Sequence, residues 1–85
     1  MKALCVHDIR LAQFTPGAVE HDATKRAIFW SCPCGCGTIG HIDLNKCGVE
    51  HGRKGLTVKC PVGIINPDGT SHWVGRLEEG QWIEK

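Results

Sequence analysis

The chain has no tyrosine, a single methionine and only two phenylalanines, so three tryptophans supply most of its aromatic surface. With 85 residues it is long enough for one domain, and we expect residues 1–85 to fold as a single unit. Below roughly 70–80 residues a core rarely supplies more than about 3–5 kcal/mol, and this chain lies just above that range. A covalent or metal staple would add what such a small core lacks.

Long apolar runs are also missing. No stretch approaches the roughly 18 apolar residues of a membrane span. The short apolar run at Ala3–Val6 is interrupted by His7, Asp8 and Arg10 before the apolar region of a secretory signal, about 7–15 residues long, could form. We therefore expect a cytoplasmic protein, in which a reducing environment keeps thiols free and clustered cysteines bind metal.

An excess of charge of either sign is absent, because ten basic residues face nine acidic ones and the net charge is +1. This balance does not by itself indicate a polyanionic partner. The sequence also lacks HExxH, the deaminase pattern of HxE with PCxxC, and a Ser-His-Asp signature. We therefore predict that the protein is not an enzyme.

The feature that the chain does have is the segment Cys-Pro-Cys-Gly-Cys-Gly, in which Cys32, Cys34 and Cys36 fall within five residues. Cysteines this close make poor disulfide partners, because bridging them strains the backbone. The spacing therefore favours a metal site over disulfides. Two further soft donors follow later in the chain, Cys60 before a proline and His72 before a tryptophan.

Zinc in a structural site takes four tetrahedral ligands from Cys, His, Asp or Glu. The chain offers one candidate more than zinc needs: Cys32, Cys34, Cys36, Cys60 and His72. An iron–sulfur centre is an alternative that the sequence leaves open. The sequence also leaves open that Cys60 is a buried thiol and that His72 is a strand histidine without a metal. It leaves open a second site as well, drawn from Cys5, His7, Cys47 or His51.

Alternating apolar residues and many turn signals predict an all-β domain of about six strands without a helix, similar to a zinc ribbon. The CPCGCG segment would be the turn of the first hairpin, and Asn66–Gly69 would be a second turn. Residues 15–24 and 45–55 are predicted as loops. The expected strands lie within residues 1–14, at 25–32 and 38–44, at 56–65 with a break or bulge at Pro61, and in a terminal hairpin of 70–77 and 81–84.

Residues 29–37, an aromatic residue leading into CPCGCG, and residues 71–82, Ser-His-Trp leading into a hairpin that ends in Trp, carry a resemblance to a known family. The chain resembles small uncharacterised bacterial and phage domains with a Phe-x-Cys-Pro-Cys-Gly-Cys-Gly motif and a later Cys-x-Ser-His-aromatic motif, which are regarded as zinc binders. The resemblance implies a phage or mobile-element origin and action beside other proteins. The family has a cysteine three residues before the histidine, where this chain has Gly69, and Cys60 is the natural replacement.

These observations lead to three functional hypotheses. The first is a zinc module that binds a protein partner, such as a host factor, through exposed tryptophans among Trp30, Trp73 and Trp82. The alternative is nucleic-acid binding, in which tryptophans would stack on bases beside a basic face of Lys25, Arg26, Arg53, Lys54, Lys59 and Arg76. A metal-dependent hydrolase is the third, and it would need a general base from Asp43, Asp68, Glu78 or Glu79.

Overall fold

The computed structural model describes residues 1–84, and all but one of its regular elements are β-strands. Among those residues there is no α-helix, and the only helical element is one short 3₁₀ turn. The predicted all-β class is therefore confirmed. The elements are β1 (Leu4–Cys5), η1 (Ile9–Ala12), β2 (Ala18–Asp22), β3 (Ala27–Ser31), β4 (Ile39–Asp43), β5 (Val49–Gly52), β6 (Gly55–Val58), β7 (Val62–Ile65), β8 (Ser71–Glu78) and β9 (Gln81–Glu84).

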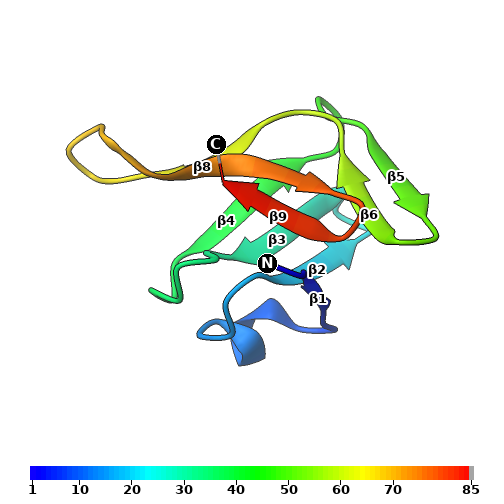
Figure 1. Cartoon of the computed structure of the whole chain (residues 1–85), viewed down its shortest axis with the longest axis horizontal. Coiled ribbons are helices and arrows are strands. Elements are labelled where there is room, and N and C mark those ends of the chain that lie inside the picture. Colours follow the sequence, from blue (N-terminus) through cyan, green and yellow to red (C-terminus); the bar gives the residue numbers. More distant parts are fainter. Residues whose placement is uncertain (85) are drawn as a thin grey trace.

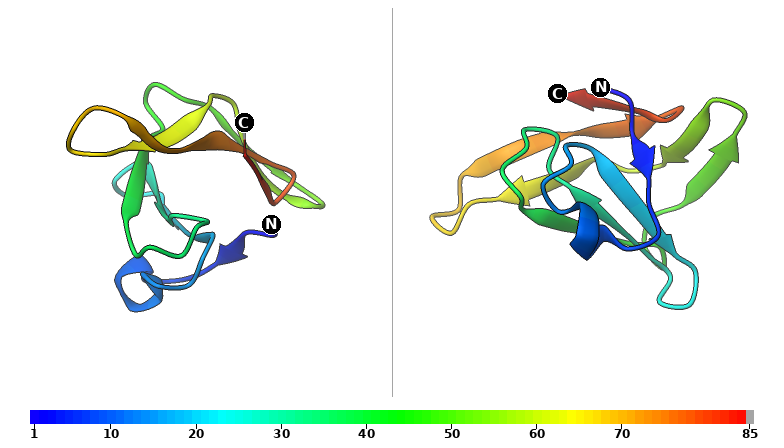
Figure 2. Two further views of the ribbon diagram at one scale, coloured as in Figure 1. Left: turned by 60° about the vertical axis from the view of Figure 1, so that its left-hand side comes forward. Right: turned by 90° about the horizontal axis from the view of Figure 1, so that it is seen from below.

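The strands form three sheets, with the orders β1-β2-β3-β4, β5-β6 and β7-β8-β9. All neighbouring strands are antiparallel except β1 and β2, which run parallel. The three-stranded sheet lies across one face of the four-stranded sheet, and the β5–β6 hairpin lies at one end of both (Figure 1). Figure 2 shows the same two layers from the side, with the β7–β8 turn projecting beyond them.

The core between the layers follows from the alternation along β3. Ile28 and Trp30 point into it, as does Cys32 just after the strand, and all three are fully buried. From the opposite sheet, Trp73 and Trp82 meet Trp30, with ring centroids 4.9–5.7 Å apart. Such aromatic contacts stabilise a core beyond the area they bury.

The three tryptophans are therefore core residues: Trp30 is 0%, Trp73 6% and Trp82 3% exposed. The hypothesis that they form a partner-binding surface is wrong. The physical reason is the small number of large side chains, since a domain this small needs its tryptophans to fill the space between its sheets.

The N-terminal segment joins the two layers. Met1 and Ala3 form backbone hydrogen bonds with Trp82 and Gly80 beside β9, and Val6 donates to Val19 of β2. A strand was expected within residues 1–14, but it extends over only Leu4–Cys5. The 3₁₀ turn η1 follows, and the Asp8 carboxylate caps its first turn.

Two segments predicted as loops contain strands. Residues 15–24 include β2, which lies between β1 and β3, and residues 45–55 include β5, which pairs with β6. Both segments are rich in polar residues because only Ala18 and Val19 of β2 are buried, and no residue of β5 is. The hairpin of β3 and β4 and the terminal hairpin of β8 and β9 are confirmed.

No helix in the described part of the chain is long and apolar enough to cross a membrane.

Candidate metal centre

The CPCGCG segment forms a compact turn between β3 and β4. Its backbone is closed by a hydrogen bond from Cys32 N to Thr38 O of 2.9 Å and by one from Gly35 N to Cys32 O of 3.0 Å. Gly35 and Gly37 both have φ of 85°, in the left-handed region that side chains other than glycine disfavour. These two glycines bend the chain so that the thiols on either side of them face one another.

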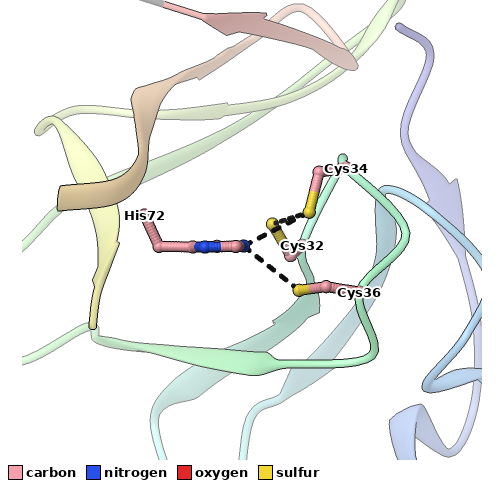
Figure 3. Close-up of side chains that lie close together, drawn as sticks. All are labelled: Cys32, Cys34, Cys36 and His72. Carbon is pink, nitrogen blue, oxygen red and sulfur yellow. Dashed lines mark hydrogen bonds between the residues drawn. The ribbon is translucent and has the colours of Figure 1, made fainter. Parts of the chain in front are cut away.

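The three thiols of this turn meet the imidazole of His72, as Figure 3 shows. Cys32 Sγ lies 3.2 Å from Cys34 Sγ, and His72 Nε2 lies 3.3 Å from Cys34 Sγ and 3.2 Å from Cys36 Sγ. All four donor atoms lie within 4.8 Å of one another. Ligand atoms around a tetrahedral zinc would be roughly 3.5–3.8 Å apart, given its usual bond lengths. The group is therefore close enough to hold one metal ion.

His72 comes from the other sheet. It lies near the start of β8, where the strand alternation turns Trp73 into the core and leaves His72 exposed toward the thiols. The pairing of β7 with β8 is irregular between Ile64 and Ile65, next to this position. A metal held by the four residues would therefore connect the β3–β4 turn to the β7–β8 hairpin.

The thiols differ in their electrostatic surroundings. Burial raises the pKa of Cys32 to about 12, because no water stabilises the thiolate there. Hydrogen bonds from Thr38, first from its hydroxyl and then from its backbone amide, lower the pKa of Cys36 to about 6. The thiolate of Cys36 therefore forms more readily than that of Cys32, and a nearby cation would favour ionisation of Cys32.

Cys60 is not part of this group. It forms a disulfide with Cys47, and their Cα atoms lie 5.9 Å apart. The two cysteines flank the β5–β6 hairpin, beside the hydrogen bond from Lys59 N to Gly48 O. The prediction of Cys60 as a metal candidate is thus corrected, as is the expectation that all thiols stay free. The sequence feature that indicates this disulfide is a glycine-containing hairpin flanked by two cysteines, and it was overlooked.

The other donors considered from the sequence do not assemble into a second site. The only group of three or more Cys, His, Asp or Glu donors close enough for a metal, within residues 1–84, is the one in Figure 3. Cys5 is a free, exposed thiol. His51 stacks on His21 with ring centroids 5.1 Å apart, and neither ring was predicted to meet the other.

Several residues that support the CPCGCG turn were not predicted from the sequence to lie near it. Thr38 contacts the Cys36 thiol, and Gln13 Nε2 donates to Gly37 O at 2.8 Å. The ring of Phe14 packs so close to Gly37 that a side chain there would collide with it. The last two contacts come from residues 13 and 14, which precede the turn by about twenty positions, and no spacing pattern indicated them.

No family model matches the chain, and neither the curated proteins nor the solved structures include one with significant similarity to it.

Proposed function

We propose that this protein is a small zinc-binding module, without catalytic activity, that acts by binding a protein partner. The observation that carries the proposal is the convergence of Cys32, Cys34, Cys36 and His72 from two different hairpins. Three thiols and one imidazole are a donor set of structural zinc sites. An iron–sulfur cluster is usually held by four cysteines, so the single histidine favours zinc.

The same donor set argues against catalysis. A catalytic zinc keeps one coordination position open for water or substrate, whereas four side-chain ligands fill a tetrahedral site. A zinc bound here would stabilise the thiolate of Cys32, which burial disfavours, and would fix His72 against the turn. Its contribution would be to hold the two hairpins together.

A partner surface has to lie away from the buried tryptophans. The two most exposed large apolar side chains of residues 1–84 are Leu11, 88% exposed, and Phe14, 72% exposed, which lie three positions apart in the chain. We propose that these two residues contribute to partner binding, since exposed apolar groups next to one another are typical of interaction sites. The resemblance of the CPCGCG segment to phage domains makes a host protein the partner that we predict.

Nucleic-acid binding is less well supported than it was from the sequence. The buried tryptophans offer no stacking surface. Two lysines of the expected basic face also form ion pairs, Lys54 with Glu79 and Lys59 with Glu50.

The metal proposal is tested by native mass spectrometry and elemental analysis of protein purified without added metal. We expect one zinc per chain, which is lost in acid. Cys36→Ser should lose the zinc, whereas Cys5→Ser, which replaces an exposed free thiol outside the group, should retain it. Metal-free protein that folds fully and does not take up added zinc would refute the proposal.

The partner proposal needs a separate test. Host proteins that crosslink to the wild-type domain would be identified and then expressed for direct binding measurements. Leu11→Glu should weaken this binding, while Ile65→Glu, an exposed apolar control at the end of β7, should not. Equal binding by both variants would exclude this surface.

A further inference from the structure

The Cys47–Cys60 disulfide lies beside a hollow that the proposed zinc function does not use. This hollow has a volume of about 260 Å³ and lies between β6 and β8. Residues 57–61 form one wall and residues 76–78 the other. Cys60 is part of the first wall, and Arg76 and Glu78 project outward from the second.

The two cysteines of the disulfide are not equally exposed. Cys47 is buried, with 6% of its surface exposed, and it does not line the hollow. Cys60 is half-buried and does line it. A thiolate that attacks a disulfide must approach one sulfur along an open path, so the hollow leads an attacking group to Cys60.

The charges around the hollow indicate what kind of thiol fits. Arg76 offers a guanidinium to a carboxylate, and Glu78, two residues along the same strand, offers a carboxylate to an ammonium group. The Lys59 ammonium is already paired with Glu50 at 2.6 Å. The free charges are thus of opposite sign, which matches the zwitterionic head of a small amino-acid-derived thiol.

We propose that Cys60 is a thiol–disulfide exchange site for a small zwitterionic thiol of the glutathione class. The thiolate of the small molecule attacks Cys60 Sγ and forms a mixed disulfide. The Cys47–Cys60 bond breaks, and its electron pair leaves with the Cys47 sulfur, which then takes a proton from water. A second molecule of the thiol releases Cys60 and leaves as the oxidised dimer, so the protein disulfide is reduced as two small thiols are oxidised.

The surrounding contacts would keep the fold intact when this disulfide opens. Leu56 and Val58 of β6 are buried in the core. The turn between β8 and β9 is bound to β6 by Gly80 N donating to Leu56 O at 2.8 Å and Glu79 N donating to Thr57 Oγ1 at 2.9 Å. The hairpin is therefore held in place without the disulfide, which allows the bond to open and close.

The test exploits the positions of lysine and arginine along the chain. Trypsin would place Cys60 alone in peptide 60–76 and Cys47 alone in peptide 47–53, apart from the other four cysteines. Wild-type protein, loaded with zinc, is treated with a limited amount of reduced glutathione and then quenched with a maleimide. We expect glutathione on peptide 60–76 and maleimide on peptide 47–53.

Two matched variants sharpen the assignment. With oxidised glutathione, Cys47→Ser should take up one glutathione at Cys60, and Cys60→Ser should leave Cys47 unmodified over the same time. Equal modification of both cysteines, or glutathione on peptide 47–53 of the wild type, would overturn the proposed asymmetry. Zinc content measured on the same samples keeps this result separate from the fate of the metal site.

Recognition of the zwitterion is tested with Arg76→Glu. The rate at which Cys60 of this variant reacts with oxidised glutathione is divided by its rate of reaction with uncharged hydroxyethyl disulfide. Any change in the intrinsic reactivity of Cys60 then cancels. We expect this ratio to fall by about tenfold relative to wild type, because a favourable local charge is replaced by a repulsive one. An unchanged ratio would show that the hollow does not select the reagent, and the proposal would then be wrong.

Discussion

Gly40 in β4 is the position where the packing of the tryptophan core can be tested most directly. A Cβ at this position would lie 2.5 Å from Trp30 Nε1 and 2.6 Å from Trp30 Cζ2. Ordinary carbon contacts are about 3.5–4.0 Å, so Gly40→Ala requires a shift of about 1 Å. Trp30 is fully buried and its ring lies against those of Trp73 and Trp82, so a shift of Trp30 would disturb the packing of all three.

We expect Gly40→Ala to destabilise the domain by about 2–3 kcal/mol, near the upper end for overpacked cores. For a domain of this size that loss corresponds to a fall in Tm of roughly 10–20 °C. The measurement is urea unfolding followed by tryptophan fluorescence, together with thermal unfolding by circular dichroism. Both should be made at a fixed zinc concentration, because bound metal also changes Tm.

Gly52→Ala is the matched control, also in a strand. A Cβ at Gly52 would lie 3.5 Å from Gly55 O, an ordinary contact, and the change should be close to neutral. Trp30→Phe supplies a double-mutant cycle, because phenylalanine lacks the indole atoms that the new methyl would meet. In that background Gly40→Ala should cost much less than it does alone. If Gly40→Ala alone is as harmless as the Gly52 control, the packing between β4 and Trp30 described above is wrong.

Three further predictions concern the site and the disulfide. At a free zinc concentration of 100 Kd, zinc should stabilise the wild type by about 2.7 kcal/mol. His72→Ala should fold but should not gain this stability, and thermal unfolding with and without zinc tests this. Cys47→Ser removes the disulfide, which closes a loop over a sequence separation of 13. The variant should have a free energy of unfolding about 3 kcal/mol lower than wild type and the same zinc content. An unchanged free energy of unfolding would contradict this prediction. In metal-free protein, alkylation of Cys36 should rise with pH through a midpoint near its pKa of about 6, because the thiolate is the reactive form, and Thr38→Val should move that midpoint upward. Mass spectrometry across a pH series measures it, and a midpoint above 8 in the wild type would refute it.

The strands that the sequence predicted correctly are those in which the side chains alternate clearly. In β3, Ile28 and Trp30 face the core and Phe29 faces the other side, and the β8–β9 hairpin shows a similar pattern. The strands that were missed, β2 and β5, carry Glu, His and Asp or Glu, His and Gly in succession. Each of them pairs with the next strand through a short hairpin, β2 with β3 and β5 with β6. A run of successive polar residues shows no alternation with a period of two, so the local pattern does not mark either segment as a strand.

Four of the five predicted metal candidates are brought together, and the reason the fifth is not lies in local geometry. Cys60 lies two residues after the end of β6, and hairpin pairing with β5 places it opposite Cys47. Counting soft donors cannot distinguish a ligand from half of a disulfide, because both need only a thiol at a suitable distance. Recognising β5 as a strand would have made the distinction, so the error in the site followed from the error in the fold.

The metal candidates and the tryptophan core are built on the same strands. Cys32 lies two residues after Trp30 and on the same face, so the strand that buries the indole also carries a thiol to the edge of the core. His72 immediately precedes Trp73, and the alternation of β8 turns one toward the thiols and the other toward Trp30. A metal bound by this group would therefore fix the two strands at the point where their tryptophans meet. In a domain with so few large side chains, a metal at this site and the tryptophan core would act on the same contact between the two sheets.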